Sequence, residues 1–188
     1  GKIYINVGAV NDAPVALDDS VDTSEDTSRS FNVLLNDTDV DNDNLEITNF
    51  DQPEHGTISY LGNGEFNYTP DANFNGSDSF SYTINDGHGG NSTATMTINV
   101  AAVNDSPDVA DDSISTSEDT TVTTSNVLAN DSDVEGDTLT ITDFGQGAHG
   151  TVSYNNNGTF NYTPEANFHG SDSFTYTVSH GNGGITTG

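Results

Sequence analysis

The sequence predicts an all-β protein built from two tandem, seven-stranded β-sandwiches. Apolar and polar residues alternate in short runs, as they do in strands with one buried face, and no stretch shows helical periodicity. The same pattern also occurs twice, about 94 residues apart, which is the size of an independent sandwich domain.

The internal repeat sets the expected domain boundaries. Residues 10–14 return as residues 103–107, and residues 78–82 return as residues 172–176. Residues 4–7 also match residues 97–100, the expected last strand of the first repeat. We therefore expect residues 1–10 to be the last strand and linker of a preceding repeat. Residues 11–103 form repeat 1, and residues 104–188 form repeat 2 without its last strand, as in a fragment cut from a longer array.

Seven strands are expected in each repeat. Gly62-Asn63-Gly64 and Asn156-Asn157-Gly158 indicate hairpin turns, because asparagine and glycine tolerate positive φ. Alternating aromatic and aliphatic side chains supply the expected core. In repeat 1 the expected strands cover residues 15–23, 27–34, 45–50, 56–61, 65–69, 78–84 and 92–100.

The charge of the chain excludes several kinds of partner. Thirty acidic residues stand against two basic ones, Lys2 and Arg29, and the formal net charge is −28. Nucleic acids and anionic membrane surfaces both require clusters of basic residues, and no apolar run is long enough to insert into a membrane. So high a charge is also typical of disorder, but the regularly spaced aromatic residues indicate a folded core. A bound cation is then expected to offset the repulsion between carboxylates.

The strongest chemical signal is an acidic loop that occurs in both repeats. Residues 37–43 read Asp-Thr-Asp-Val-Asp-Asn-Asp, and residues 131–137 read Asp-Ser-Asp-Val-Glu-Gly-Asp. Closely spaced carboxylates with no basic partner favour a hard divalent cation, and calcium accepts many flexible oxygen ligands. Magnesium is the weaker candidate because it requires a stricter geometry, and a solvated acidic loop is the alternative without a metal.

Neither loop is complete by itself, because position 12 is Thr48 or Thr142 where a helix-loop-helix calcium site has a bidentate glutamate. In a seven-stranded sandwich, the entering linker and the loop at Asp86 lie at the same end as the acidic loop. The turns at Glu25 and Asp78 lie at the other end, so that ligands from both repeats are expected near their junction. The candidate calcium ligands are Asn11, Asp12, Glu25, Asp26, Asp37, Asp39, Asp41, Asp43, Asp78 and Asp86, and Asn104, Asp105, Glu118, Asp119, Asp131, Asp133, Glu135, Asp137 and Asp172.

Four motifs together resemble the cadherin-like, Ig-like tandem repeats of large bacterial surface adhesins. They are the Val-Asn-Asp-x-Pro linker, the Ser-Glu-Asp turn, the Asp-rich loop and the Asp-Ser-Phe-x-Tyr-Thr strand. The resemblance covers nearly the whole chain. It implies RTX-type secreted adhesins, calcium that stiffens the array, and the linker, turn and loop acids as its ligands. One position departs from the pattern, since Asp86 of repeat 1 is replaced by His180 in repeat 2.

The expected function is a calcium-rigidified spacer or adhesion repeat on a bacterial surface or in a secreted protein, with roles such as biofilm formation. Its expected partners are neighbouring repeats, with a cell-surface glycan or a second copy as further candidates. No catalytic motif is recognisable, and matched residues in both repeats favour a structural role, so that no enzyme is expected. The alternative is a carbohydrate-binding module that uses Tyr60, Phe74 and Phe168, attached to an extracellular polysaccharide-degrading protein.

Overall fold

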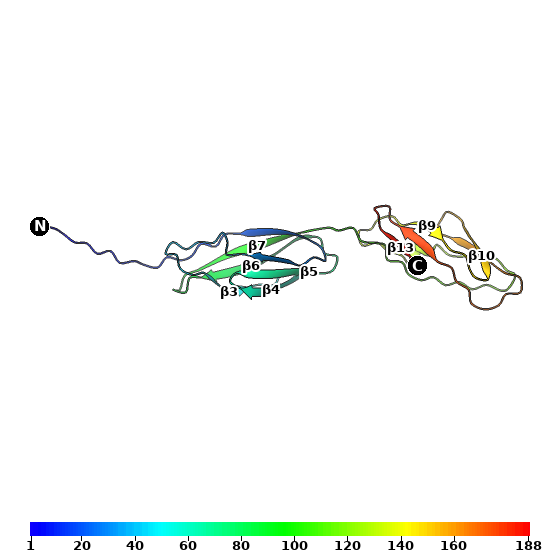
Figure 1. Ribbon diagram of the computed structural model, residues 1–188, viewed down its shortest axis with the longest axis horizontal. Coiled ribbons are helices and arrows are strands. Elements are labelled where there is room, and N and C mark those ends of the chain that lie inside the picture. Colours follow the sequence, from blue (N-terminus) through cyan, green and yellow to red (C-terminus); the bar gives the residue numbers. More distant parts are fainter. The chain divides into compact units, whose positions relative to one another are not determined.

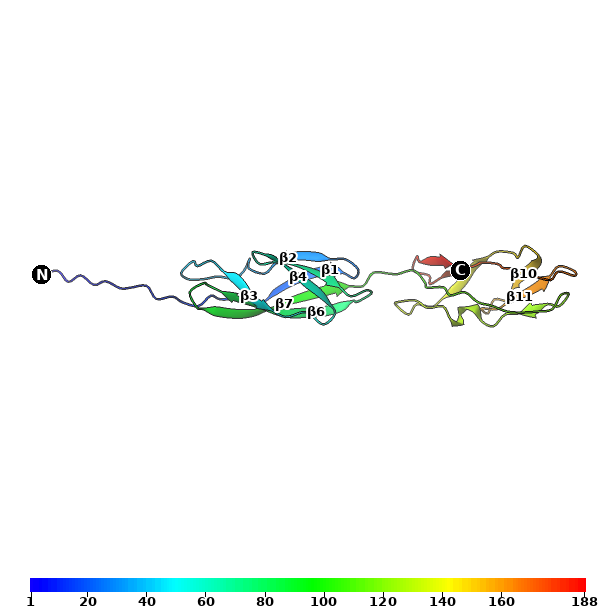
Figure 2. The same ribbon diagram turned by 90° about the horizontal axis from the view of Figure 1, so that it is seen from below.

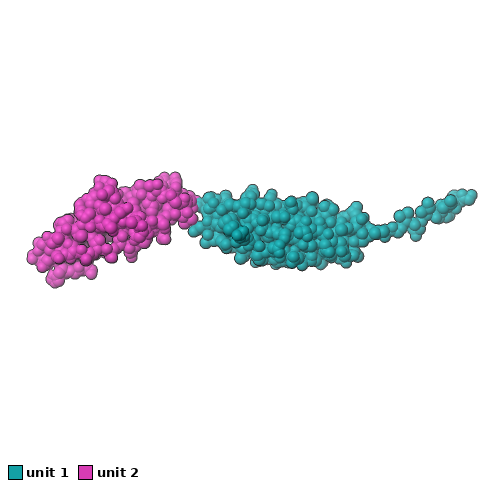
Figure 3. Space-filling view, turned by 180° about the vertical axis from the view of Figure 1, so that it is seen from behind, with its two compact units in different colours: residues 1–103 teal, residues 104–188 magenta.

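The computed structural model describes all residues, 1–188, as two compact units. The first unit comprises Gly1–Val103 and the second Asn104–Gly188 (Figure 3). Each unit is described separately below. None of the helical segments has the length and apolar character needed to cross a membrane.

Repeat 1 is a sandwich of a four-stranded and a three-stranded sheet (Figures 1 and 2). The larger sheet has the order β1-β7-β6-β3, and the smaller sheet has the order β2-β5-β4. All neighbours pair antiparallel except β1 and β7, which run parallel. The strands are β1 (Asp19–Ser24), β2 (Arg29–Asn32), β3 (Glu46–Phe50), β4 (Gly56–Gly62), β5 (Glu65–Pro70), β6 (Gly76–Asn85) and β7 (Asn91–Ala101).

The core of repeat 1 lies between these two sheets. Every second residue of β6 and β7 points inward, so that Phe80, Tyr82 and Ile84 meet Met96 and Ile98. From the opposite sheet, β5 contributes residues 66 and 68 to the same cluster. The period-2 alternation seen in the sequence is thus the alternation between the core and solvent.

Repeat 2 has six strands, most of them shorter than their equivalents in repeat 1, and it has no counterpart of β1. They are β8 (Val122–Thr123), β9 (Thr140–Phe144), β10 (Gly150–Tyr154), β11 (Phe160–Pro164), β12 (Tyr176–Ser179) and β13 (Ile185–Thr187), with one 3₁₀ turn at Val127–Ala129. They form the sheets β10-β11-β8 and β13-β12-β9. The core centres on Phe160, Tyr176 and Val178. The all-β prediction is confirmed in both units.

The two repeats differ at the edge where β1 lies in repeat 1. There β1 pairs with Met96–Ala101 of β7, whereas the equivalent residues 112–117 of repeat 2 form no strand. The expectation placed the last strand of repeat 2 outside the chain, but its first three residues are present as β13 and pair with β12. Gly188 aligns with Ala94 of repeat 1.

Residues 1–10 form no assigned strand. Their large side chains are almost fully exposed, from 79% at Val10 to 90% at Ile3. The strand expected for this segment, by its likeness to residues 97–100, therefore has no partner within repeat 1.

Candidate metal centres in the two repeats

The Asp-rich loop of repeat 1 folds its carboxylates toward one another. Asp39 Oδ1 accepts hydrogen bonds from the backbone N–H groups of Asp41 (2.8 Å) and Asp43 (3.3 Å). Asn42 has φ +62°, and this left-handed residue reverses the chain between the two donors. One oxygen from each of Asp39, Asp41 and Asp43 consequently lies within 4.8 Å of the others.

The second oxygen of Asp39 has no partner. Asp39 Oδ2 is shielded from solvent and accepts no hydrogen bond. A buried carboxylate oxygen without a partner loses its hydration and gains nothing in return, which costs about 1–3 kcal/mol or more. A divalent cation held by oxygen ligands removes this cost, so that the loop fits the calcium that the sequence predicts.

The linker that enters repeat 1 is attached to the same end. The backbone N–H of Asp12 donates to Asp41 Oδ2 (2.8 Å), and Asn11 Nδ2 donates to Asp86 Oδ2 (2.9 Å). Asp86 is buried and also accepts from the backbone N–H groups of His88 and Gly90. The hydrogen bond from Asn11, with these backbone donors, lowers the pKa of Asp86 below its ordinary value. Asp86 thus holds the linker by accepting the hydrogen bond from Asn11.

Repeat 2 reproduces the backbone hydrogen bonds of this loop. Asp133 Oδ1 accepts from the backbone N–H groups of Glu135 (3.1 Å) and Asp137 (3.0 Å), while Asp133 Oδ2 is again buried without a partner. The linker makes the matching contact, because the backbone N–H of Asp105 donates to Glu135 Oε2 (3.3 Å). Gly136, with φ +75°, replaces Asn42 at the left-handed position.

His180 changes the environment of the loop in repeat 2. Its side chain is fully buried, with Nδ1 3.4 Å from Asp137 Oδ2 and Nε2 3.3 Å from Asn104 Nδ2. Asn182 Nδ2 also donates to Asp137 Oδ2 at 2.6 Å. In repeat 2 an imidazole therefore contacts both the linker and the acidic loop, whereas in repeat 1 the carboxylate of Asp86 contacts the linker.

The remaining turn acids lie at the other end of each repeat. Glu25 is buried, and its Oε1 accepts a hydrogen bond from the backbone N–H of Val103, where the chain leaves repeat 1. Asp26 Oδ1 accepts from the backbone N–H of Asn73 (3.3 Å), and Asp119 makes the same bond to Asn167 (2.9 Å). Glu118 is exposed in the equivalent turn of repeat 2.

Asp78 and Asp172 use both oxygens inside their repeats. Asp78 accepts from the backbone N–H groups of Glu54, His55 and Ser79 and from the hydroxyl of Tyr68. Asp172 makes the same four bonds, including one of 2.8 Å from Tyr162. Burial acts to raise the pKa of Asp172, but these hydrogen bonds outweigh it and the pKa lies below its ordinary value. Both carboxylates hold a loop to a strand, which is a structural role.

Asp37 and Asp131 each lie beside a second aspartate that the sequence pattern did not identify. Asp37 Oδ1 accepts from the backbone N–H of Leu17 (2.8 Å), and its Oδ2 lies 3.5 Å from the hydroxyl of Tyr82. The same hydroxyl lies 2.8 Å from Asp19 Oδ2. Burial raises the pKa of both Asp19 and Asp37. In repeat 2, Asp131 and Asp112 flank Tyr176 in the same way.

The missed partners, Asp19 and Asp112, share a sequence signal. Both follow another aspartate and precede a serine in the repeated Asp-Asp-Ser motif. That motif was visible as part of the repeat, but only the fold shows that its second aspartate meets a tyrosine about 64 residues later.

The arrangement of two sandwiches agrees with a family comparison. Residues 11–99 and 104–188 both match the family described as the bacterial Ig domain. The chain belongs to this family. The two matched segments of the bacterial Ig domain protein compare with predicted repeats at residues 11–103 and 104–188.

Solved structures show a related fold. The extracellular domains 1–5 of protocadherin gamma B2 share 15% identity with a TM-score of 0.51, over 95% of this chain and 38% of that one. The protocadherin gamma B4 extracellular domain shares 15% identity with a TM-score of 0.50, over 97% and 32%. An endo-fucoidan hydrolase of glycoside hydrolase family 107 shares 20% identity over 98% and 29%, but with a TM-score of 0.40. The two protocadherin structures support the cadherin-like part of the predicted fold.

One curated protein also matches part of the chain. Protein GAMETE EXPRESSED 2 of Arabidopsis thaliana is 45% identical over 74 residues, which is 39% of this chain and 8% of that protein. The match covers so little of that protein that it indicates a shared repeat only.

The aromatic residues considered for sugar binding are partly covered. The ring of Phe74 stacks on His55 at 4.3 Å, and the ring of Phe168 stacks on His149 at 4.4 Å. Tyr60 packs on Phe66 with ring centroids 4.9 Å apart. Each ring therefore already has a neighbour, which leaves less of its surface for stacking on a sugar.

Proposed function

We propose that this chain is a calcium-stiffened spacer and adhesion segment of an extracellular protein, in which each repeat holds calcium between its acidic loop and its entering linker. The observation that carries the proposal is the buried, unpartnered oxygen of Asp39, which recurs at the matched Asp133. By its resemblance, the parent protein is a large secreted surface adhesin of the RTX type, and this segment is not catalytic.

The linker contacts explain how bound calcium would act on the chain. In both repeats the linker backbone already donates to a carboxylate of the loop, from Asp12 to Asp41 and from Asp105 to Glu135. The carboxylates that would hold the ion are therefore the ones that hold the linker. An occupied site fixes their positions, and the backbone of the linker is ordered with them.

The required affinity is modest. Extracellular calcium modules have dissociation constants of about 0.1–1 mM. At ten to a hundred times that constant, each site stabilises its repeat by roughly 1.4–2.7 kcal/mol. With a net charge of −28, bound calcium also lowers the repulsion across the whole chain.

Two measurements test the proposal. Titration calorimetry of calcium into chelator-treated protein should show saturable binding, and thermal melts should show a higher Tm with calcium. Since the chain has no cysteine, single cysteines introduced into each repeat can carry a pair of fluorophores. The distribution of energy-transfer efficiencies should narrow when calcium is added.

Two different results would contradict the proposal, the first in whole and the second in part. Absence of saturable binding would mean that the loops are only solvated. If calcium binds and raises the Tm but the distribution of energy-transfer efficiencies keeps its width, the metal site stands and the stiffening role is wrong.

A further inference from the structure

Repeat 1 has a cleft along one open edge of its sandwich. The cleft lies between β3, the edge strand of the larger sheet, and the hairpin of β4 and β5 in the smaller sheet, and it has a volume of about 390 Å³. Sites for small molecules typically have volumes of about 300–1,000 Å³. Leu34, Leu45 and Ile47 line the cleft and pack against the core, so that its floor is apolar.

Tyr60 forms an aromatic wall of this cleft. Its ring centroid lies 4.9 Å from that of Phe66 and 6.0 Å from that of Phe50, and the rings are tilted by 40° and 52°. These contacts fix Tyr60 without stacking flat on it, and it remains 37% exposed. Its hydroxyl oxygen accepts from the backbone N–H of Gly64 (3.4 Å), which leaves the hydroxyl hydrogen for a ligand. A fixed aromatic ring with a polar tip suits a ligand that has both an apolar face and hydroxyl groups.

Three polar side chains of the same cleft make no hydrogen bond within the protein. Asn44, Glu46 and Asn63 line the cleft and are exposed. Asn63 accepts a hydrogen bond from Asn32 through its backbone carbonyl (2.8 Å) and leaves its side-chain amide free. Asparagine offers two donors and an acceptor, and an ionised glutamate offers acceptors only. The set can therefore bind hydroxyl groups, which both donate and accept.

Repeat 2 keeps the apolar residues of this cleft but differs in the polar ones. The two leucines, the isoleucine and the tyrosine recur there, whereas Thr138 and Thr140 replace Asn44 and Glu46. The hydroxyl of Thr140 donates to a backbone carbonyl of β12 (3.0 Å), and the side chain of Asn157 accepts two hydrogen bonds within its own turn. The packing residues are thus common to both repeats, but the free polar groups belong to repeat 1.

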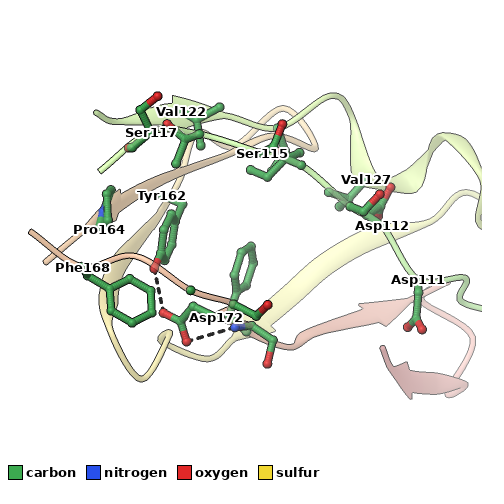
Figure 4. A pocket seen from close by; sticks show the side chains of 18 of the residues that line it. Asp111, Asp112, Ser115, Ser117, Val122, Val127, Tyr162, Pro164, Phe168 and Asp172 are labelled. Atoms are coloured by element: carbon green, nitrogen blue, oxygen red, sulfur yellow. Dashed lines mark hydrogen bonds between the residues drawn. The ribbon is translucent and has the colours of Figure 1, made fainter. Parts of the chain in front are cut away.

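The large cavity of repeat 2 lies elsewhere. Figure 4 shows it beside Tyr162 and Asp172, which are joined by a hydrogen bond of 2.8 Å. None of the residues equivalent to those of the cleft lines this cavity. The cleft with its free polar groups is therefore a feature of repeat 1.

Charge and hydrogen bonding together select the kind of ligand. The net charge of −28, with Glu46 in the cleft itself, repels an anion. A purely apolar ligand would remove two amides and a carboxylate from water without giving them partners, which costs free energy. A cation would meet only one carboxylate among the lining residues. An uncharged ligand with hydroxyl groups and one apolar face satisfies both Tyr60 and the polar side chains.

We propose that the cleft of repeat 1 binds an uncharged sugar residue of a glycan, with Tyr60 against the sugar ring and the side chains of residues 44, 46 and 63 on its hydroxyl groups. None of these four residues is a proposed calcium ligand. The sugar site is therefore separate from calcium stiffening, and it adds a class of ligand to the adhesion role.

Nuclear magnetic resonance of nitrogen-15-labelled protein tests the proposal, in buffer with calcium and again with a chelator. The probes are cellohexaose, laminarihexaose, xylohexaose and mannohexaose, with hexagalacturonic acid as the charged comparison. At least one uncharged probe should shift the backbone amides of residues 44–47 and 60–64 in a saturable way. The equivalent residues 138–141 and 154–158 should not shift, and the charged probe should have no effect on either set.

Two variants and a matched control locate the site. The double variant Asn44→Thr, Glu46→Thr introduces the residues that repeat 2 already has at these positions, so that repeat 1 should still fold. It should raise the Kd about tenfold or more, which corresponds to 1.4 kcal/mol. Tyr60→Ala should do the same. Tyr154→Ala, the equivalent change in repeat 2, is the control and should leave the Kd unchanged.

Three results would overturn the proposal. They are the absence of a localised shift with every uncharged probe, equal binding of the charged probe, and binding that survives both the double variant and Tyr60→Ala. Because the shifts are measured with and without calcium, failure of the sugar site is distinguishable from failure of the calcium sites, which calorimetry reports.

Discussion

At the scale of single residues, the carboxylates divide by what their two oxygens contact. Asp78 and Asp172 have hydrogen bonds to both oxygens, mostly from backbone N–H groups, and need no ion. Asp39 and Asp133 use one oxygen to shape their loop and keep the other free. The sequence pattern identified all four as ligand candidates. It could not separate them, because the donors that satisfy Asp78 include backbone groups 23 and 24 residues away.

Replacing Asp39 tests this division. Asp39→Asn keeps the Oδ1 acceptor that shapes the loop but removes one anionic ligand. The stabilisation of repeat 1 by calcium should fall by roughly 1.4–2.7 kcal/mol, with little change in calcium-free buffer. Asp78→Asn is the matched control, and it should lower stability by about 1–3 kcal/mol with or without calcium. Native-state hydrogen exchange of the core amides reports on repeat 1 separately. If calcium stabilises the two variants by the same amount, this division of the carboxylates is wrong.

The half-buried Asp19 should give the stability of repeat 1 a characteristic pH dependence. Burial raises the pKa of Asp19 above its ordinary 3.8, with further contributions from the neighbouring Asp37 and Asp18. Relative to the unfolded chain, the fold therefore favours the protonated form. The resulting stability is fully present below the unfolded pKa and is lost as the pH rises through the folded pKa.

Asp19→Asn should remove that part of the pH dependence. In calcium-free buffer, the difference in unfolding free energy between wild type and variant should shift in favour of wild type as the pH is lowered toward 3.8. Urea denaturation at several pH values measures it. Asp22→Asn, exposed on the same strand, is the control. A difference that stays constant with pH would argue against a raised pKa at Asp19.

At the scale of elements, the turns of the β4–β5 hairpin show what local sequence determines. The sequence predicts a turn at Gly62-Asn63-Gly64, and all three residues have positive φ. The strand bounds in repeat 1 also lie within a few residues of those expected, because alternation marks where one face becomes buried. The pairing of β1 with β7 was not predictable in this way. Alternation identifies a strand but gives neither its partner nor its direction.

The two glycines of this turn should differ in their tolerance of substitution. Gly62 has φ +99° and open space around it, so that Gly62→Ala should cost about 1–2 kcal/mol from backbone strain alone. Gly64 has φ +78°, and an added Cβ would lie 2.7 Å from Asn32 Oδ1. Gly64→Ala should therefore cost at least about 1 kcal/mol more. That difference corresponds to a further drop in Tm of roughly 4–8 °C for a domain of this size. A smaller loss at Gly64 than at Gly62 would show that the turn relaxes freely.

At the scale of the whole molecule, the repeat in the sequence determined most of what the structure shows. The matched residues predict the two sandwiches and the position of each acidic loop. The alternation of successive loops between the two ends of a sandwich predicts that each acidic loop lies near its linker. The parallel pairing in repeat 1 was less evident. It joins Asp19–Ser24 to Met96–Ala101, two segments that are far apart in the sequence. Non-local pairings of this kind are set by the fold as a whole rather than by any local pattern.

That parallel pairing has a consequence for how repeat 1 bears load. β1 follows the entry of the chain, β7 precedes its exit, and they are joined in one continuous register from Asp19–Met96 to Ser24–Ala101. Because the two strands run in the same direction, tension applied through the two ends of the domain pulls them past each other. Their hydrogen bonds are then loaded together in shear rather than opened one after another. A tether made of such domains would extend little under a sudden pull, since rupture of the first domain requires the whole strand pair to yield at once.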